Sequence, residues 1–432
     1  MTDSTTPDDL QTAAHAGPSA DPAHRDSVLL ASVHGAVAAA GEDAGTAAHY
    51  GDPVQEQRAL VRGRAVTDLS HKGVLTVTGP DRLSWLTTLT SQVLTGMRPG
   101  QSTEALFLSV QGRIEQAPRV LEDGATAWLI TEAHEREPLR AWLESMRFAL
   151  RVEVADRTED VAVLGAVSVP EHLLPLSRQL APDAAAPLVW TDPWPGVAAG
   201  GWAYGRVEDH PGLDRTWHEV LIPRDRLLEA VTGPAADGLV LAGSWAAEAL
   251  RIEAWRPRLG VDTDERTVPH ELDWLRTSVH LSKGCYKGQE TVARVHNLGH
   301  PPRRLVHLDL DGSEHTLPRA GAEVLAGQRV VGRVTSAALH HEAGPIALAV
   351  VKRGVDPQAE LRVREAPQAE EAPGSGIADA DVEHGGPEHG GPEHGAPEHR
   401  EEWAAAQTVV VPTDAGQVIE REKGFLRGPR GR

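Results

Sequence analysis

The residues with the clearest capacity for chemistry surround the single cysteine of the sequence. They form the motif Lys283-Gly284-Cys285-Tyr286-Lys287-Gly288-Gln289-Glu290. Glycines placed so close to the cysteine favour a tight, exposed loop over a packed strand. After the motif, Val292 and Val295 are three positions apart, which predicts a helix that runs to His296. We therefore expect the thiol to lie in an exposed loop just before a helix N-terminus.

The charges near Cys285 determine what its thiol could do. Unpaired N–H groups at a helix N-terminus favour a thiolate, and Lys283, Lys287 and Arg294 add positive charge. Both effects lower the pKa of a thiol and raise its reactivity, whereas Glu290 opposes them. The alternative is a glycine turn between two helices in which the cysteine only packs, as free cysteines commonly do. Composition and spacing leave both interpretations open.

Length, charge and cysteine content narrow the class of protein. A chain of 432 residues is long enough for two or three domains. Its formal net charge of -20 disfavours strong nucleic-acid binding. One cysteine cannot form an intramolecular disulfide, which fits a reducing, cytoplasmic location. The acidic N-terminus lacks the order of a signal peptide, and no apolar run approaches the roughly 18 residues of a membrane span, so we expect no membrane contact.

The elements that must position the motif belong to an α+β fold with mainly antiparallel sheets. A β-rich stretch over residues 71–79 is followed by a helix that begins near Pro80. Glycine turns then separate three predicted strands at 105–110, 113–121 and 125–131. Further on, residues 244–255 predict a helix with Ser244 as its N-cap.

The chain is predicted to divide into a body and a C-terminal β domain. The segment 1–25 lacks large apolar side chains and is expected to be disordered, and the body spans 26–302. After Pro301-Pro302 the pattern becomes purely β, which predicts a small barrel over 303–412 and a tail over 413–432. Strand-like segments on either side of a Gly- and Pro-rich insert at about 366–403 predict a hairpin with an expanded loop.

The insert carries four regularly spaced histidines, each preceded by glutamate. These are His384, His389, His394 and His399. Neutral imidazoles bind nickel or zinc, but flexible, evenly spaced histidines supply no fixed ligand geometry. We expect a solvated linker with no metal, and metal binding is the alternative.

The cysteine motif resembles the K-G-C-Y-x-G-Q-E signature of the YgfZ family and matches it at every fixed position. These proteins are relatives of the glycine-cleavage T protein and bind tetrahydrofolate. Further stretches that resemble the family are Asp68-Leu69-Ser70-His71-Lys72-Gly73, Val77-Thr78-Gly79-Pro80-Asp81-Arg82 and Leu250-Arg251-Ile252-Glu253-Ala254, with Gly260-Val261-Asp262 and Pro269. The resemblance covers about residues 28–351 and the last strand near Val409. It implies an aminomethyltransferase-like body of two subdomains followed by a β-barrel.

The resemblance also implies a ligand and a site. Tetrahydrofolate or a related folate should sit in a central cavity of the body, with the cysteine motif at its rim. Glu253 is a candidate for holding the pterin edge, and an ordinary exposed carboxylate is the alternative. By the same resemblance Cys285, Lys283 and Tyr286 would carry the chemistry. The remaining motif positions would contact the ligand: Gly284, Gly288, Gln289, Glu290 and Arg294.

The functional class follows from what the family does and from what this chain lacks. The family is implicated in making or maintaining iron–sulfur proteins, including iron–sulfur enzymes that modify tRNA, so partners should be those proteins or their assembly machinery. The T protein instead transfers an aminomethyl group and uses an aspartate pair. In this sequence those positions hold Gln116 and Ala117, which have no titratable proton near neutral pH. We therefore favour an accessory protein over an aminomethyltransferase, which remains the competing hypothesis.

Three roles for the cysteine stay open under the favoured hypothesis. Cys285 could be a redox-responsive thiol, a transient metal ligand or a covalent partner. A single thiolate is too few to hold a stable iron–sulfur cluster, which usually takes four cysteines. Any cluster contact would need ligands from another protein.

Overall fold

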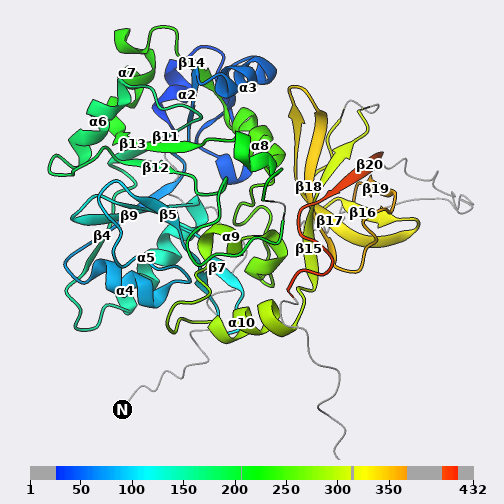
Figure 1. Cartoon of the computed structure of the whole chain (residues 1–432). Helices are drawn as coiled ribbons and strands as arrows, with labels where there is room; N and C mark the ends of the chain where they lie inside the picture. The colour runs from blue at the N-terminus through cyan, green and yellow to red at the C-terminus, as the bar shows by residue number, and fades with distance from the viewer. Residues whose placement is uncertain (1–25, 206, 313–315, 367–400, 417–432) are drawn as a thin grey trace, which may run out of the picture.

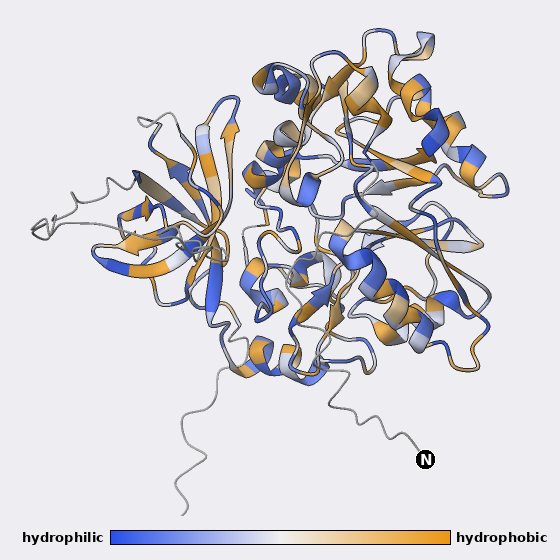
Figure 2. Ribbon diagram, turned by 180° about the vertical axis from the view of Figure 1, so that it is seen from behind, coloured by the Kyte–Doolittle hydropathy of each residue, from blue (hydrophilic) through white to orange (hydrophobic). Residues whose placement is uncertain are grey.

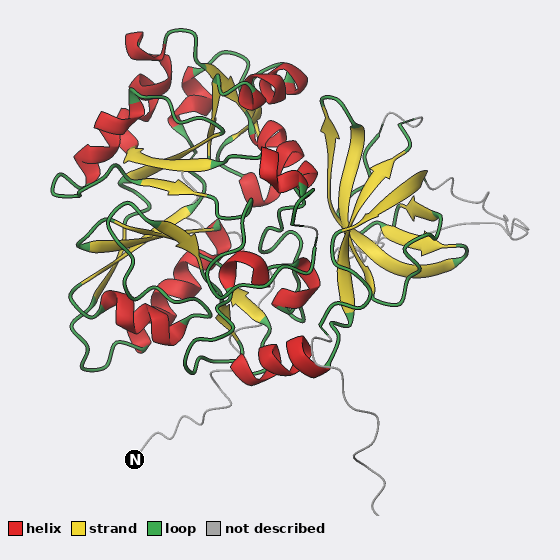
Figure 3. Cartoon of the chain, in the orientation of Figure 1, coloured by secondary structure: helices red, strands yellow, loops and turns green. Residues whose placement is uncertain are grey.

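The computed structural model describes residues 26–205, 207–312, 316–366 and 401–416. They form a body of two five-stranded sheets with helices, and a closed barrel beside that body (Figures 1 and 3). The predicted fold class of helices, mainly antiparallel sheets and a C-terminal β-barrel is confirmed. Within these ranges no helix is both long and apolar enough to cross a membrane.

The first sheet of the body is antiparallel throughout. Its strands, in spatial order, are β10 (Glu153–Asp156), β4 (Gly73–Thr78), β9 (Thr126–Thr131), β8 (Arg119–Glu122) and β5 (Ser102–Glu104). Helices α4 (Arg82–Leu89) and α5 (Arg136–Ser145) pack on it through Leu86 and Leu139, against Leu75 and Val77 of β4. This apolar layer leaves the other side of the sheet to face the second sheet.

The second sheet contains the one parallel pair of the body as described. Its strands, in spatial order, are β12 (Val189–Thr191), β13 (His218–Pro223), β11 (Val161–Ala166), β3 (Ala65–Asp68) and β14 (Val240–Ala242), and β14 runs parallel to β3. Helices α2 (Val28–Ser32), α6 (Leu173–Leu180) and α7 (Leu227–Thr232) share an apolar cluster with one face. Helices α3 (Pro53–Val61) and α8 (Ser244–Glu253) pack on the other face, so α8 lies between this sheet and the barrel (Figure 1).

Short elements complete the body. Strands β1 (Val37–Ala38) and β2 (Ala47–His49) form a separate hairpin, and β6 (Phe107–Leu108) pairs with β7 (Ile114–Gln116) in another. Helices α9 (Leu275–Ser278) and α10 (Gln289–Leu298) follow α8. Single 3-10 turns are η2 (Gly41–Asp43), η3 (Ala133–Glu135), η4 (Pro211–Asp214), η5 (Arg224–Arg226), η6 (Pro234–Ala236) and η7 (Pro269–Leu272).

The barrel is closed by six antiparallel strands. In order around it they are β15 (Arg303–Leu310), β18 (Gly344–Lys352), β17 (Arg329–His340), β16 (Glu323–Ala326), β19 (Leu361–Arg364) and β20 (Glu402–Val409). Closure removes the exposed edges that an open sheet would leave. β19 pairs antiparallel with β20, as the predicted hairpin requires. Residues 367–400 of the predicted insert lie outside the described residues, as does the segment 1–25, whereas Glu402 and Trp403 at the predicted end of the insert belong to β20.

Three local predictions are wrong. Of the predicted strand at 105–110 only Phe107–Leu108 (β6) forms a strand, because the Leu106 N–H bonds the Ser91 hydroxyl instead of a neighbouring strand. Residues 113–121 are two strands rather than one, because Pro118 has no N–H to donate and the Ala117 N–H bonds the Glu135 carboxylate instead of a neighbouring strand. The N-cap of α8 is Gly243 rather than Ser244, and Trp255 lies beyond the helix with a φ of 56°. Figure 2 shows hydrophobic residues along many of the strands, and hydrophobic and hydrophilic residues alternating along the helices.

Candidate functional site

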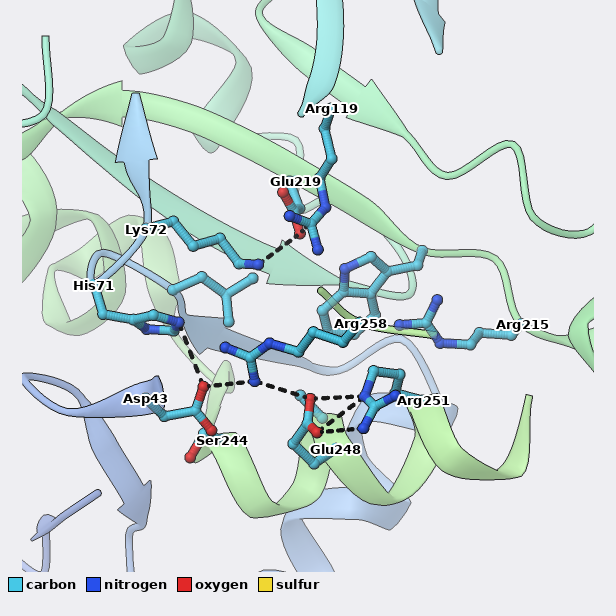
Figure 4. A pocket seen from close by; sticks show the side chains of 13 residues that line it. Asp43, His71, Lys72, Arg119, Arg215, Glu219, Ser244, Glu248, Arg251 and Arg258 are labelled. Atoms are coloured by element: carbon cyan, nitrogen blue, oxygen red, sulfur yellow. Dashed lines mark hydrogen bonds and ion pairs between the residues drawn. The ribbon is translucent and has the colours of Figure 1, made fainter. Parts of the chain in front are cut away.

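A small, highly charged cavity lies inside the body. It measures about 40 Å³. Its walls come from both sheets and from α8, and Figure 4 shows their charged side chains converging. The lining residues are Asp43, Leu69, His71, Lys72, Arg119, Arg215, Trp217, Glu219, Ser244, Ala247, Glu248, Arg251 and Arg258. Most of these groups are buried, so electrostatic interactions here are stronger than they would be in water.

Arg258 occupies the centre of this cavity. Its Nη2 lies 2.8 Å from Glu132 Oε2, and its Nη1 lies 2.9 Å from Asp43 Oδ1 and 3.3 Å from Glu248 Oε1. The guanidinium therefore joins three carboxylates that come from distant parts of the chain. Figure 4 shows the Arg258 side chain among the other lining residues, with its contacts to Asp43 and Glu248.

Glu132 is the main counter-charge behind the cavity. Its Oε1 lies 3.0 Å from Lys72 Nζ and 3.2 Å from Arg119 Nη1. Burial raises the pKa of Glu132, but the charges of Arg258, Lys72 and Arg119 outweigh that effect and hold the pKa well below its usual range. Burial lowers the pKa of Lys72, and the nearby Arg119 adds to that lowering.

Glu219 is the carboxylate best placed to receive a ligand. Its Oε1 lies 3.3 Å from Arg119 Nε and 3.9 Å from Lys72 Nζ. Its Oε2 is buried and has no hydrogen-bond partner. Buried acceptors are usually satisfied, so this oxygen is available to a donor that enters the cavity. Apolar Leu69 and Trp217 line the same space.

The cysteine motif forms an exposed loop in front of α10, as predicted. Cys285 is exposed, and α10 begins at Gln289. Gly288 has a φ of 83°, and a Cβ there would lie 2.6 Å from the Ser109 carbonyl oxygen. A side chain at this position would therefore be strained and would also clash, which explains the glycine.

Both lysines of the motif have partners of their own. The Lys283 ammonium donates to the carbonyl oxygens of Thr87, Thr90 and Gln92, at 3.0 Å for the last. It therefore anchors the loop to the C-terminal end of α4, where cations are favoured. Burial lowers the pKa of Lys283 to about 8, while the three carbonyl acceptors favour the charged ammonium.

Lys287 ties the motif to the β6–β7 hairpin. Its Nζ lies 3.0 Å from Glu115 Oε2, and both side chains are well exposed. Gln116 and Ala117 follow, and the amide oxygen of Gln116 is buried without a partner. The hairpin thus presents no carboxylate at 116 or 117, and the neighbouring Glu115 is paired with the motif.

The other predicted residues of the motif lie outside the charged cavity. Tyr286 packs on the apolar core, its ring 5.0 Å from Lys283 Nζ, and burial raises its pKa to about 12. Gln289 Nε2 donates to the Lys283 carbonyl oxygen at 3.2 Å, which closes the loop on itself. Glu290 and Arg294 are exposed, as is Gly284. None of the motif residues is among those that line the cavity.

Glu253 faces the barrel. Its Oε2 lies 3.4 Å from Nε2 of His340 at the end of β17. The imidazole of His340, close to this carboxylate, lowers the pKa of Glu253. This carboxylate contributes to the seam between α8 and the barrel, whereas Glu248, five positions earlier on α8, lines the cavity.

A chain of polar contacts runs from the motif towards the cavity. Gln92, whose carbonyl oxygen accepts from Lys283, donates through Nε2 to the Thr277 carbonyl oxygen at 2.8 Å. Thr277 in turn hydrogen-bonds Glu104, which lies 2.5 Å from Arg256. The cavity is reached through Asp192, which pairs with Arg256 at 3.2 Å and with the lining residue Arg215 at 2.9 Å.

Sequence reasoning missed most of the cavity residues. Lys72 and Arg251 lie inside stretches that carried the family resemblance, but the roles of Arg258, Glu132 and Glu219 were not predicted. Their signal was weak, because charged residues at strand and loop positions normally suggest solvent exposure. Among the described residues no group of three or more histidine, cysteine or acidic side chains could hold a metal ion.

Comparisons with known proteins place these features in a family context. Residues 33–170 match the GCVT N-terminal domain, and residues 303–372 match the glycine cleavage T-protein C-terminal barrel domain. An aminomethyltransferase from Nostoc sp. is 28% identical over 69% of this chain and 79% of its own length. One from Streptomyces coelicolor is 29% identical over 69% of this chain and 81% of its own length.

A solved structure has a similar fold. The glycine cleavage system aminomethyltransferase T from Bartonella henselae superposes with a TM-score of 0.61 at 18% identity, over 90% of this chain and 97% of its own. At that identity the likeness shows the fold alone. The chain is therefore T-protein-like, with an aminomethyltransferase-like body and the T-protein C-terminal barrel.

Proposed function

We propose that the chain is a YgfZ-type, folate-binding accessory protein that serves the assembly or maintenance of iron–sulfur proteins. Its clients would include iron–sulfur enzymes that modify tRNA, and Cys285 would be its reactive group. The observation that carries this proposal is the complete K-G-C-Y-x-G-Q-E motif on an exposed loop. An exposed thiol can reach a partner protein, which a buried cysteine could not. A single cysteine also suits a reducing, intracellular compartment.

Folate would bind in the central cavity. The free Oε2 of Glu219 could accept hydrogen bonds from the donor-rich edge of a reduced pterin, and Trp217 and Leu69 could contact its ring. This assigns to Glu219 the role predicted for Glu253, whose partner is a barrel histidine. The motif residues would then act at the loop rather than on the pterin.

Aminomethyl transfer to folate is the second candidate. It is favoured by the similarity to relatives that are named aminomethyltransferases. It is disfavoured by Gln116 and Ala117, because neither can act as a carboxylate base. Glu115 does not replace them, since it is exposed and pairs with Lys287.

Two assays separate the candidates. The first measures iron–sulfur enzyme activity in a strain whose own copy carries Cys285→Ala, with Cys285→Ser as a closer mimic and wild type as the reference. The second measures turnover with tetrahydrofolate and an aminomethyl donor. We expect reduced iron–sulfur enzyme activity and no turnover. Turnover together with normal iron–sulfur enzymes would contradict the accessory role.

A further inference from the structure

A surface turn that rests on ion pairs forms part of the wall of the central cavity, to which it contributes Asp43. The turn runs from Gly41 to Gly45 at the tip of the β1–β2 hairpin, which hydrogen-bonds to neither large sheet. Gly41 and Gly45 have φ values of 65° and 90°. These left-handed positions at both ends favour glycine and allow the backbone to change direction.

Two acidic side chains hold the turn to the body, in addition to one backbone hydrogen bond from the Ser27 N–H to the Gly45 carbonyl oxygen at its end. Asp43 Oδ1 lies 2.9 Å from Arg258 Nη1 and 3.4 Å from His71 Nε2, both of which line the cavity. Glu42 Oε2 lies 2.9 Å from His134 Nδ1 at the surface. Glu42 is 40% exposed and Asp43 only 15%, so the turn inserts one carboxylate inward and leaves the other outside.

Few apolar contacts support these ion pairs. Ala38, Ala40 and Gly41 are exposed, and Val37 is 45% exposed. The next buried residues along the chain are Thr46 and Ala47. Segments with few buried apolar contacts open at low free-energy cost, so the turn can separate from the body without unfolding it.

The size of the cavity requires such an opening. Small-molecule sites usually measure about 300–1,000 Å³, far more than the about 40 Å³ found here. Arg258 is one of the side chains that line this small cavity, and Asp43 helps to hold it there. Release of the turn would remove one of the three carboxylates that hold the guanidinium, which would let the side chain move aside.

We propose that the Gly41–Gly45 turn is a latch that closes the central cavity through the Asp43–Arg258 and Glu42–His134 pairs, and that it must open for folate to enter. This inference rests on the proposed folate site for the identity of the ligand. The closing pairs themselves are independent of that identity.

The test measures cavity access in two ways. The first is the association rate constant of tetrahydrofolate by stopped flow. The second needs no folate and measures acylation of Lys72 by an amine-reactive ester with mass spectrometry, since Lys72 is only 4% exposed. The variants are Asp43→Asn, which removes the inner pair, and Glu42→Gln, which removes only the outer one. Glu144→Gln removes an exposed ion pair to Arg140 on α5 and serves as the matched control.

We expect both latch variants to raise the association rate constant and Lys72 acylation by at least about threefold, and the control to change neither. Exposed Lys287 gives the reference for reagent reactivity. Unchanged acylation in both variants, with the fold intact by circular dichroism, overturns the latch. Absence of folate binding in all proteins, including wild type, overturns the folate site instead, and the acylation result still decides the latch.

Discussion

The central cavity and the cysteine loop use charge in opposite ways. In the cavity, Glu132 and Arg258 are buried and each contacts several partners of opposite sign. At the loop, Cys285 is exposed and the Lys287–Glu115 pair is open to solvent. Fixed, desolvated charges suit the orientation of a ligand, whereas an exposed thiol on a glycine loop suits contact with another protein.

Under the proposed function, ligand binding and thiol chemistry are separate tasks. A series of hydrogen bonds and ion pairs from Lys283 to Arg215 joins the two regions, and no motif residue lines the cavity. Variants in one region should therefore leave the other largely intact. The following predictions test that separation, beginning with the largest effect.

Removal of Glu132 should cost the most stability. Glu132→Ala leaves Lys72, Arg119 and Arg258 buried with one counter-charge fewer. Breaking a buried ion pair by removing one partner costs about 3–5 kcal/mol. We expect a loss of that order in the free energy of unfolding, measured by urea denaturation.

Two control substitutions, one at an exposed acidic residue and one at the cysteine, are compared with Glu132→Ala. Glu137→Gln, which removes an exposed pair with Arg140, and Cys285→Ser should each change the free energy of unfolding by less than about 1 kcal/mol. A Glu132→Ala protein as stable as these two would show that the cavity charges are not mutually dependent.

As the pH falls, the protein should lose stability through His270, which contacts α10, before most carboxylates become protonated. His270 is fully buried and its Nε2 lies 3.0 Å from the Val292 carbonyl oxygen of that helix. Burial lowers the pKa of His270 from 6.5 to about 3. Below pH 6.5 the unfolded chain therefore binds more protons than the folded chain, and stability falls as the pH falls.

This pH dependence can be assigned by substitution. A single such histidine contributes a slope of at most about 1.4 kcal/mol per pH unit between roughly pH 6 and pH 4. His270→Gln keeps a donor for the Val292 oxygen but cannot titrate, so its unfolding free energy should vary less steeply over that range. Identical slopes in the two proteins would exclude His270 as the cause.

The smallest effect should come from the pair that links the loop to the hairpin. Exposed ion pairs are worth about 0.2–1 kcal/mol, so Lys287→Ala should change stability by no more than that. The loop should become slightly more mobile, and alkylation of Cys285 by iodoacetamide should accelerate by less than about fivefold. Glu115→Ala should change the stability and the alkylation rate by the same amounts as Lys287→Ala, because it breaks the same ion pair. A difference of more than tenfold between the two would mean that the lysine acts directly on the thiol.

The fold and the exposed loop could be predicted from the sequence because their signals are local. Glycines around Cys285 and the spacing of Val292 and Val295 indicated the loop and α10. The barrel was predicted because the pattern becomes purely β after Pro301-Pro302. The charged cavity could not be predicted in this way, since Glu132, Glu219 and Arg258 meet only through tertiary packing. Ser244 failed as an N-cap because Gly243 takes that position.

The most direct test of the account is calorimetric titration of tetrahydrofolate into wild type, Glu219→Gln and Cys285→Ser. Loss of one charge-assisted hydrogen bond to a buried ligand costs about 1.5–3 kcal/mol, or roughly 10- to 150-fold in affinity. We predict a loss of that size in Glu219→Gln and a change below twofold in Cys285→Ser. The reverse pattern, with full affinity in Glu219→Gln and weak binding in Cys285→Ser, would place the ligand at the loop and contradict the separation of the two sites.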